Sequence, residues 1–140
     1  MNARTTAARL LAILVLSLAA LGCEDSIIKL LGPENAESVT TIDGVFRYTS
    51  ADLDNVHDVR EYTWSNDQPR AMVRHRSFVH HGSVLILVHD GVGALVDSTF
   101  AEWELDAPTD VGVPGTWAIT FRYYGARGRV DTSLEPLPAP

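Results

Sequence analysis

The feature that most constrains the fold is a two-residue alternation of apolar and polar side chains, which begins near Val39. It is clearest in the segment 117–124, which reads Trp-Ala-Ile-Thr-Phe-Arg-Tyr-Tyr. Successive side chains of a β-strand point to opposite faces of the sheet, so a period of two indicates a strand with one face in the core. We therefore predict that Trp117, Ile119 and Phe121 face inward on a central or near-central strand.

The same alternation recurs along the chain, separated by turn-forming residues. In the segment 83–89, Val84, Ile86 and Val88 alternate with residues that are also largely apolar, which indicates a central strand. No segment after Val39 has a convincing amphipathic helical pattern. The sequence thus predicts an all-β fold, a single antiparallel β-sandwich over residues 39–135 with about seven strands, near 42–48, 58–65, 70–79, 83–89, 94–100, 116–124 and 129–134.

Several local features refine this prediction. Residues 85–100 are typical of a hairpin whose four-residue turn is Asp90–Gly93. Gly125 and Gly128 lie in a second expected turn. Arg74 and Arg76 would share one strand face and could pair with acidic residues on the next strand. Residues 136–140 contain three prolines and are expected to form an extended tail outside the sheet.

The first 22 residues have the pattern of a secretory signal. Arg4 and Arg9 precede an apolar run over 10–21, and no acidic residue occurs before Glu24. The run is too short to cross a bilayer, which requires about 20 apolar residues. We therefore expect an N-terminal signal helix that is removed, followed by a short linker over residues 23–38.

The signal ends in Leu-Ala-Ala-Leu-Gly-Cys at 18–23, which resembles the lipobox of bacterial lipoproteins. The order Ala20-Leu21 departs from that family, which usually has Leu first and a small residue next. The resemblance implies cleavage before Cys23, lipid on its thiol and a location in the bacterial cell envelope, anchored to the inner or outer membrane. Cys23 is the sole cysteine, so no disulfide or thiolate site is expected.

A second resemblance concerns the fold alone. The run Pro114-Gly115-Thr116-Trp117, followed by a glycine-containing turn and a last strand, is similar to the closing hairpin of small bacterial immunoglobulin-like and pre-peptidase-C-terminal-like sandwiches. It covers about the last third of the domain and implies no functional residues.

Charge argues against two classes of partner. Loss of Arg4 and Arg9 leaves nine of the 11 basic residues against all 18 acidic ones, a net charge of −9. A domain with this charge repels nucleic acid and anionic headgroups.

Removing 22 of 140 residues leaves 118, enough for one domain.

Five histidines raise the question of a metal site: His57, His75, His80, His81 and His89. We expect His75 and His89 on neighbouring strands joined near His80 and His81, so three of these imidazoles could converge on zinc. No recognised ligand motif is present, however, and solvated histidines at strand edges are the preferred interpretation. No metal or other cofactor is predicted.

Two acidic groups are candidate binding sites. Asp52, Asp54, Asn55 and Asp58 supply oxygen ligands of the kind that calcium prefers, but their order does not fit an EF-hand, and a polar loop is the preferred interpretation. The run Glu102-Trp103-Glu104 could form a platform for a sugar, although a buried Trp103 beside solvated carboxylates is the simpler expectation.

The sequence contains no nucleophile motif of the hydrolase type. The function predicted is therefore that of a non-enzymatic envelope lipoprotein, either structural or binding a protein or glycan. The alternative is a metal- or sugar-binding accessory module of an envelope enzyme or transporter.

Overall fold

The computed structural model describes residues 27–102 and 104–140 and confirms the all-β prediction. All strand pairs are antiparallel, and they join into one seven-stranded sheet. The elements are a 3₁₀ turn η1 (Pro33–Asn35), β1 (Ser38–Ile42), β2 (Val45–Asn66), β3 (Arg70–His75), β4 (Phe78–His89), β5 (Leu95–Phe100), β6 (Leu105–Pro108) and β7 (Gly115–Leu137).

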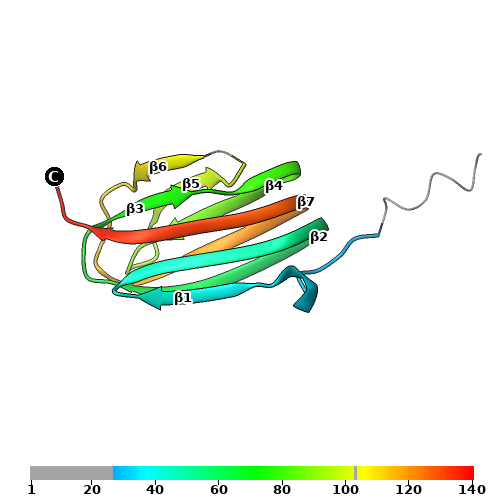
Figure 1. The fold of residues 1–140 in the computed structure, drawn as a ribbon. Helices are drawn as coiled ribbons and strands as arrows, with labels where there is room; N and C mark the ends of the chain where they lie inside the picture. The colour runs from blue at the N-terminus through cyan, green and yellow to red at the C-terminus, as the bar shows by residue number, and fades with distance from the viewer. Residues whose placement is uncertain (1–26, 103) are drawn as a thin grey trace, which may run out of the picture.

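Two long strands, β2 and β7, fold this sheet into two layers (Figure 1). They pair along their lengths, from Phe46 opposite Leu134 to Asn66 opposite Gly115, and both bend in the middle. The front layer contains β1, the first half of β2, the second half of β7, β3 and β6. The back layer contains the other halves of β2 and β7 with β4 and β5.

The two ends of the sandwich differ in construction. At one end, which we call the bend end, β2 and β7 fold over and the described chain begins at Ile27 (Figure 1). At the other, the turn end, lie the C-terminus and the connections β1–β2, β2–β3, β4–β5 and β6–β7. The two ends of the described chain are therefore on opposite sides of the domain.

Bulges with left-handed backbone produce the bend. The ladders between β2 and β7 and between β4 and β7 shift register there, and positive φ angles occur at Asp52, Asn55, Gly82, Gly125 and Gly128. A bulge adds residues to one strand and bends it while the strand continues to pair with the same neighbour. The predicted division into 42–48 and 58–65, and into 116–124 and 129–134, was therefore wrong, because each pair belongs to one continuous bent strand. The expected closing hairpin at Gly125–Gly128 is likewise absent.

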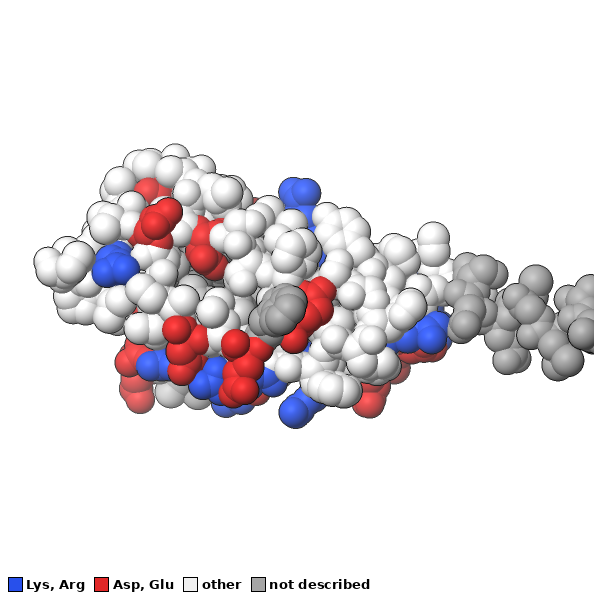
Figure 2. Space-filling model, turned by 90° about the horizontal axis from the view of Figure 1, so that it is seen from above, with Lys and Arg blue, Asp and Glu red and all other residues white. Residues whose placement is uncertain are grey.

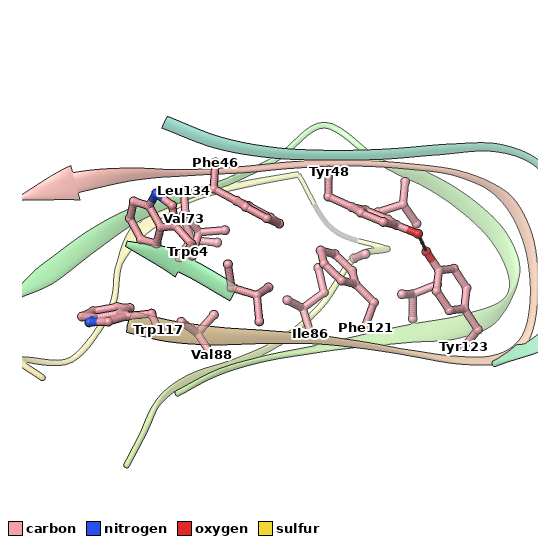
Figure 3. Close-up of a cluster of buried hydrophobic side chains, with 14 of the residues drawn as sticks. Phe46, Tyr48, Trp64, Val73, Ile86, Val88, Trp117, Phe121, Tyr123 and Leu134 are labelled. Carbon is pink, nitrogen blue, oxygen red and sulfur yellow. Dashed lines mark hydrogen bonds between the residues drawn. The ribbon is translucent and has the colours of Figure 1, made fainter. Parts of the chain in front are cut away.

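The core lies between the layers and has the predicted central strands (Figure 3). Trp117, Ile119 and Phe121 on β7 are completely buried, as are Val84, Ile86 and Val88 on β4. Aromatic contacts join the layers and the two long strands. The ring of Tyr48 stacks on Phe121 with centroids 4.0 Å apart, and Trp64 meets Trp117 edge to face at 6.0 Å.

The β4–β5 hairpin is confirmed, with Leu85 opposite Phe100. Asp90 fixes its turn, because its carboxylate accepts hydrogen bonds from the backbone N–H groups of Val92, Ala94 and Val113. The last of these bonds makes the largest contribution to lowering the pKa of Asp90. The carboxylate therefore ties the β6–β7 loop to the hairpin.

Other strands also differ from the prediction. The segment 70–79 is divided between β3 and β4 by Arg76 and Ser77, and the short strands β1 and β6 were not predicted. Pro136 lies within β7, opposite Ala71, although prolines were expected to leave the sheet. Proline is tolerated there because the N–H of Ala71 donates to Thr109 beside β6, so this pair makes no ladder hydrogen bond.

Candidate functional site

The outer face of the front layer is charged and paired with itself. Arg47 binds the Asp131 carboxylate through two nitrogens, at 2.7 and 3.2 Å. Arg74 contacts Glu135, and Arg76 lies 3.0 Å from Asp106, as expected for these two arginines. Blue and red side chains accordingly gather together along the lower edge of the molecule in Figure 2. These exposed pairs satisfy one another and leave little unmatched charge for a partner.

The outer face of the back layer is much more apolar. Alternation with the buried side chains of β4 and β7 places Leu85, Leu87 and Tyr124 on this face. Phe100 lies opposite Leu85 and Val59 lies opposite Arg122, which adds two further exposed hydrophobic side chains. We call this surface, Val59, Leu85, Leu87, Phe100 and Tyr124, the apolar face. Arg122 lies between Val59 and Leu85 in this cross-strand row, so the hydrophobic side chains flank a charged one. Hydrophobic side chains gathered on one exposed face in this way are typical of interaction sites.

An open groove of about 570 Å³ lies where β3 passes into β4. Arg76, Ser77, Phe78, Glu104 and Arg129 line it, and the Phe78 ring is exposed and lies 5.6 Å from the ring of His80. Of the predicted sugar platform, this groove contains only Glu104, whose carboxylate is 3.2 Å from Arg76. Glu102 does not line it, and Trp103 lies outside the described residues.

The histidines do not converge. β3 and β4 are not paired with each other, because β3 lies in the front layer beside β7 and β6 while β4 pairs in the back layer with β7 and β5. His75 is buried in the core, while His80 and His81 lie in the first part of β4 and His89 at its opposite end. Within residues 27–102 and 104–140, no three His, Cys, Asp or Glu side chains are placed to hold a metal ion.

His75 is a core residue, and the expectation that it is solvated was wrong. Its Nδ1 lies 3.0 Å from the Thr132 hydroxyl, and its Nε2 is buried without a partner in the described part of the chain. Position 75 continues the inward register of Ala71 and Val73. Burial, followed by the positive charge of Arg76, lowers the pKa of His75 to about 4.

This burial predicts a loss of stability in acid. Because the pKa of His75 is about 4 in the folded protein and that of an ordinary histidine is 6.5, the unfolded chain binds the proton more tightly. The contribution of neutral His75 to the free energy of unfolding is fully present above pH 6.5. It is lost as the pH drops toward 4, and the loss is about 3 kcal/mol in all. Urea unfolding at pH 7, 5.5 and 4 measures this dependence. His75→Gln should reduce it and His89→Gln should not; equal slopes in all three proteins would contradict it.

The acidic cluster considered for calcium belongs to the bend of β2, where it binds the chain that precedes the sheet. The N–H of Lys29 donates to the Asn55 carbonyl, and the N–H of His57 donates to the Lys29 carbonyl. The Asp58 carboxylate accepts a hydrogen bond from the N–H of Leu31 at 3.1 Å, and Asp54 forms an ion pair with the Lys29 ammonium group. The Asn55 side chain donates to the Ile27 carbonyl. Residues 27–31, which were predicted to lie in a linker, are thus bound to the domain.

Buried polar groups hold the next part of this segment. Asn35 is buried and donates to the carbonyls of Ala51 and Asp52. The Glu37 carboxylate accepts hydrogen bonds from the hydroxyls of Tyr48 and Tyr62. These contacts attach residues 35–37 to β2.

Tyr48 extends this network into the core. Its hydroxyl lies 2.6 Å from that of Tyr123 (Figure 3). Burial raises the pKa of Tyr123 to about 12 and keeps its phenol neutral. We interpret this neutral cluster as structural.

Known proteins provide no assignment for this arrangement. The sequence matches no model of a protein family, and the comparison with curated proteins finds no relative. In the part of the chain described here, no helix has the length and apolar character needed to cross a membrane. Cys23 lies outside that part.

Sequence reasoning missed the groove and the contacts of residues 27–37. The groove joins Arg129 on β7 to Phe78 on β4, and their proximity depends on the register of two strands distant in sequence. The apolar character of 83–89 was recognised as a sign of a central strand, but the same pattern also indicates that Leu85 and Leu87 form an apolar outer surface.

Proposed function

We propose that this protein is a lipid-anchored, non-enzymatic module of the bacterial cell envelope that binds a partner through its β-sandwich. The observation that carries the proposal is the attachment of residues 27–31 to the bend end, shortly after the signal-like segment that ends at Cys23. A lipid on Cys23 would hold the domain itself at the membrane, with only a short segment between them. Two or three acyl chains would make the attachment effectively permanent.

The apolar face is the surface that best suits a protein partner. Its members belong to β2, β4, β5 and β7, so the sheet fixes their relative positions without a flexible loop. Phe100 and Tyr124 are about half exposed and offer large apolar contacts. The paired charges of the front layer offer less, because exposed ion pairs would have to be separated before a partner could use them.

The groove supports the alternative function, a sugar-binding accessory module. Phe78 provides an exposed ring on which a pyranose could stack, and Glu104 and Arg129 provide polar groups at its sides. A glycan array would separate the two functions. Glycan binding that Phe78→Ala abolishes and Phe100→Ala leaves unchanged would favour the alternative.

The anchor is tested by Cys23→Ser. Because Cys23 is the sole cysteine, this substitution should remove all acylation and release the protein from membranes or block its processing. Metabolic labelling with a palmitate analogue, followed by membrane fractionation, measures both effects. Wild-type protein that takes up no label and fractionates away from membranes would overturn the proposal.

A further inference from the structure

The bend end carries a small apolar patch on the segment bound to β2. Ile27, Ile28 and Leu30 lie close together in the chain, and each is about two-thirds exposed. The N–H of Lys29 donates to the Asn55 carbonyl and the Lys29 carbonyl accepts from His57, so the backbone that carries these side chains is held at the bend. Tyr124 lies nearby, opposite His57, whose N–H donates to the Lys29 carbonyl. The bend end therefore combines aliphatic side chains with a half-exposed tyrosine.

The length of chain between Cys23 and this patch restricts what can cover it. The four residues from Cys23 to Ile27 span at most about 14 Å when fully extended. A lipid on Cys23 lies at the headgroup level of its membrane, and an interfacial apolar segment is buried about 5–10 Å into the same region. The patch is thus within reach of the surface to which the chain would be attached.

Charge does not by itself select this end. The turn end carries the exposed Asp43, Asp67 and Asp110, and the bend end carries the exposed Glu34 and Asp52. The lipid and the apolar side chains therefore decide which end meets the membrane, against a repulsion from anionic headgroups that fades within about 10 Å at 0.1 M salt.

We propose that the bend end lies against the membrane, with Ile27, Ile28 and Leu30 in the interfacial region. The inference rests on the lipid anchor proposed above and specifies how it orients the domain. The ten-residue halves of the strands are about 30 Å long, so the turn end projects away from the bilayer by about that distance. The apolar face, which runs along the back layer, then stands at a steep angle to the membrane, where a partner attached to the same membrane can reach it.

Single-cysteine labelling of the acylated protein in phosphatidylethanolamine–phosphatidylglycerol vesicles tests this orientation. Because acylation would occupy Cys23, a nitroxide can be attached to Leu30→Cys or, as the matched control, to Val92→Cys at the turn end. The two native side chains have similar exposures, 66% and 72%, so neither label should disturb the core. Circular dichroism and thermal unfolding of the labelled proteins check this.

We expect collisions with a water-soluble nickel relaxer to be several-fold less frequent at position 30 than at position 92, and collisions with oxygen to be more frequent. Equal accessibility on vesicles that retain the protein would overturn the orientation while leaving the anchor intact. Protection accompanied by dipolar broadening between labels would instead show that a second copy covers the patch and would overturn the inference. Failure of the acylated protein to remain on the vesicles would overturn both the anchor and the orientation.

Discussion

Replacing Trp117 with alanine is expected to lower the free energy of unfolding by about 3–5 kcal/mol. The Trp117 side chain is fully buried on β7, the strand to which β2, β3 and β4 all pair. It meets the ring of Trp64 edge to face, and its Nε1–H donates to the Val113 carbonyl at 2.9 Å. The substitution therefore removes core volume, an aromatic contact and one of the hydrogen bonds that hold the β6–β7 loop.

Tyr124→Ala is the matched control, because this aromatic residue belongs to the same strand but lies on its outer face, 48% exposed. We expect it to cost less than about 1 kcal/mol, as surface substitutions usually do. Thermal and urea unfolding should show a large decrease in Tm for Trp117→Ala and a small one for Tyr124→Ala. If Trp117→Ala melted within a degree or two of the wild type, the core assigned to this strand would be wrong.

These two residues also show why much of the fold could be predicted from the sequence. The side chains of an extended strand alternate between its faces, so the pattern around Trp117 specifies which residues are inside without knowledge of the neighbouring strands. The β4–β5 hairpin was predictable for a similar reason, because Asp90 and the glycines that follow it determine the turn locally. Both inferences use interactions within a few residues.

The bend was not predictable on the same basis. Glycines at 125 and 128 can either reverse a strand or form a bulge in it, and the outcome depends on the strand with which the next segment pairs. Here residues 130–134 continue along β2 and do not fold back on 116–124. That choice is made by contacts between segments about 80 residues apart.

In the candidate site, too, the features with a local signal were predictable and those that depend on distant segments were not. His75 could have been placed inside from its register with Ala71 and Val73, because that signal is local. The contacts of Lys29 and Leu31 with the bend join backbone groups to β2 residues more than 25 positions away, and no periodicity records them. Asp54 and Asp58 were predicted to lie in a polar loop, but both belong to β2, and their partners Lys29 and Leu31 lie in a segment expected to be a linker.

The bend predicts a second large effect, at Gly128. A Cβ atom at this position would lie 2.0 Å from the Phe78 carbonyl oxygen, and φ is +129°. The clashing atom is backbone in β4, which pairs with β7 on both sides of the bulge, so it cannot move without breaking the ladder. Gly128→Ala should therefore cost about 3–5 kcal/mol, the combined effect of a strained backbone and an overpacked contact. Urea unfolding measures this cost.

Gly93→Ala separates the two contributions. Gly93 also has a positive φ, +85°, but a Cβ atom there would have no neighbour within 4 Å. Its replacement should cost only the backbone strain, about 1–2 kcal/mol. Equal costs at 93 and 128 would contradict the close approach of β4 to β7. A larger cost at 128 would show that the bend requires glycine because two backbones meet there, and that the sandwich depends on this contact to fold its two long strands over.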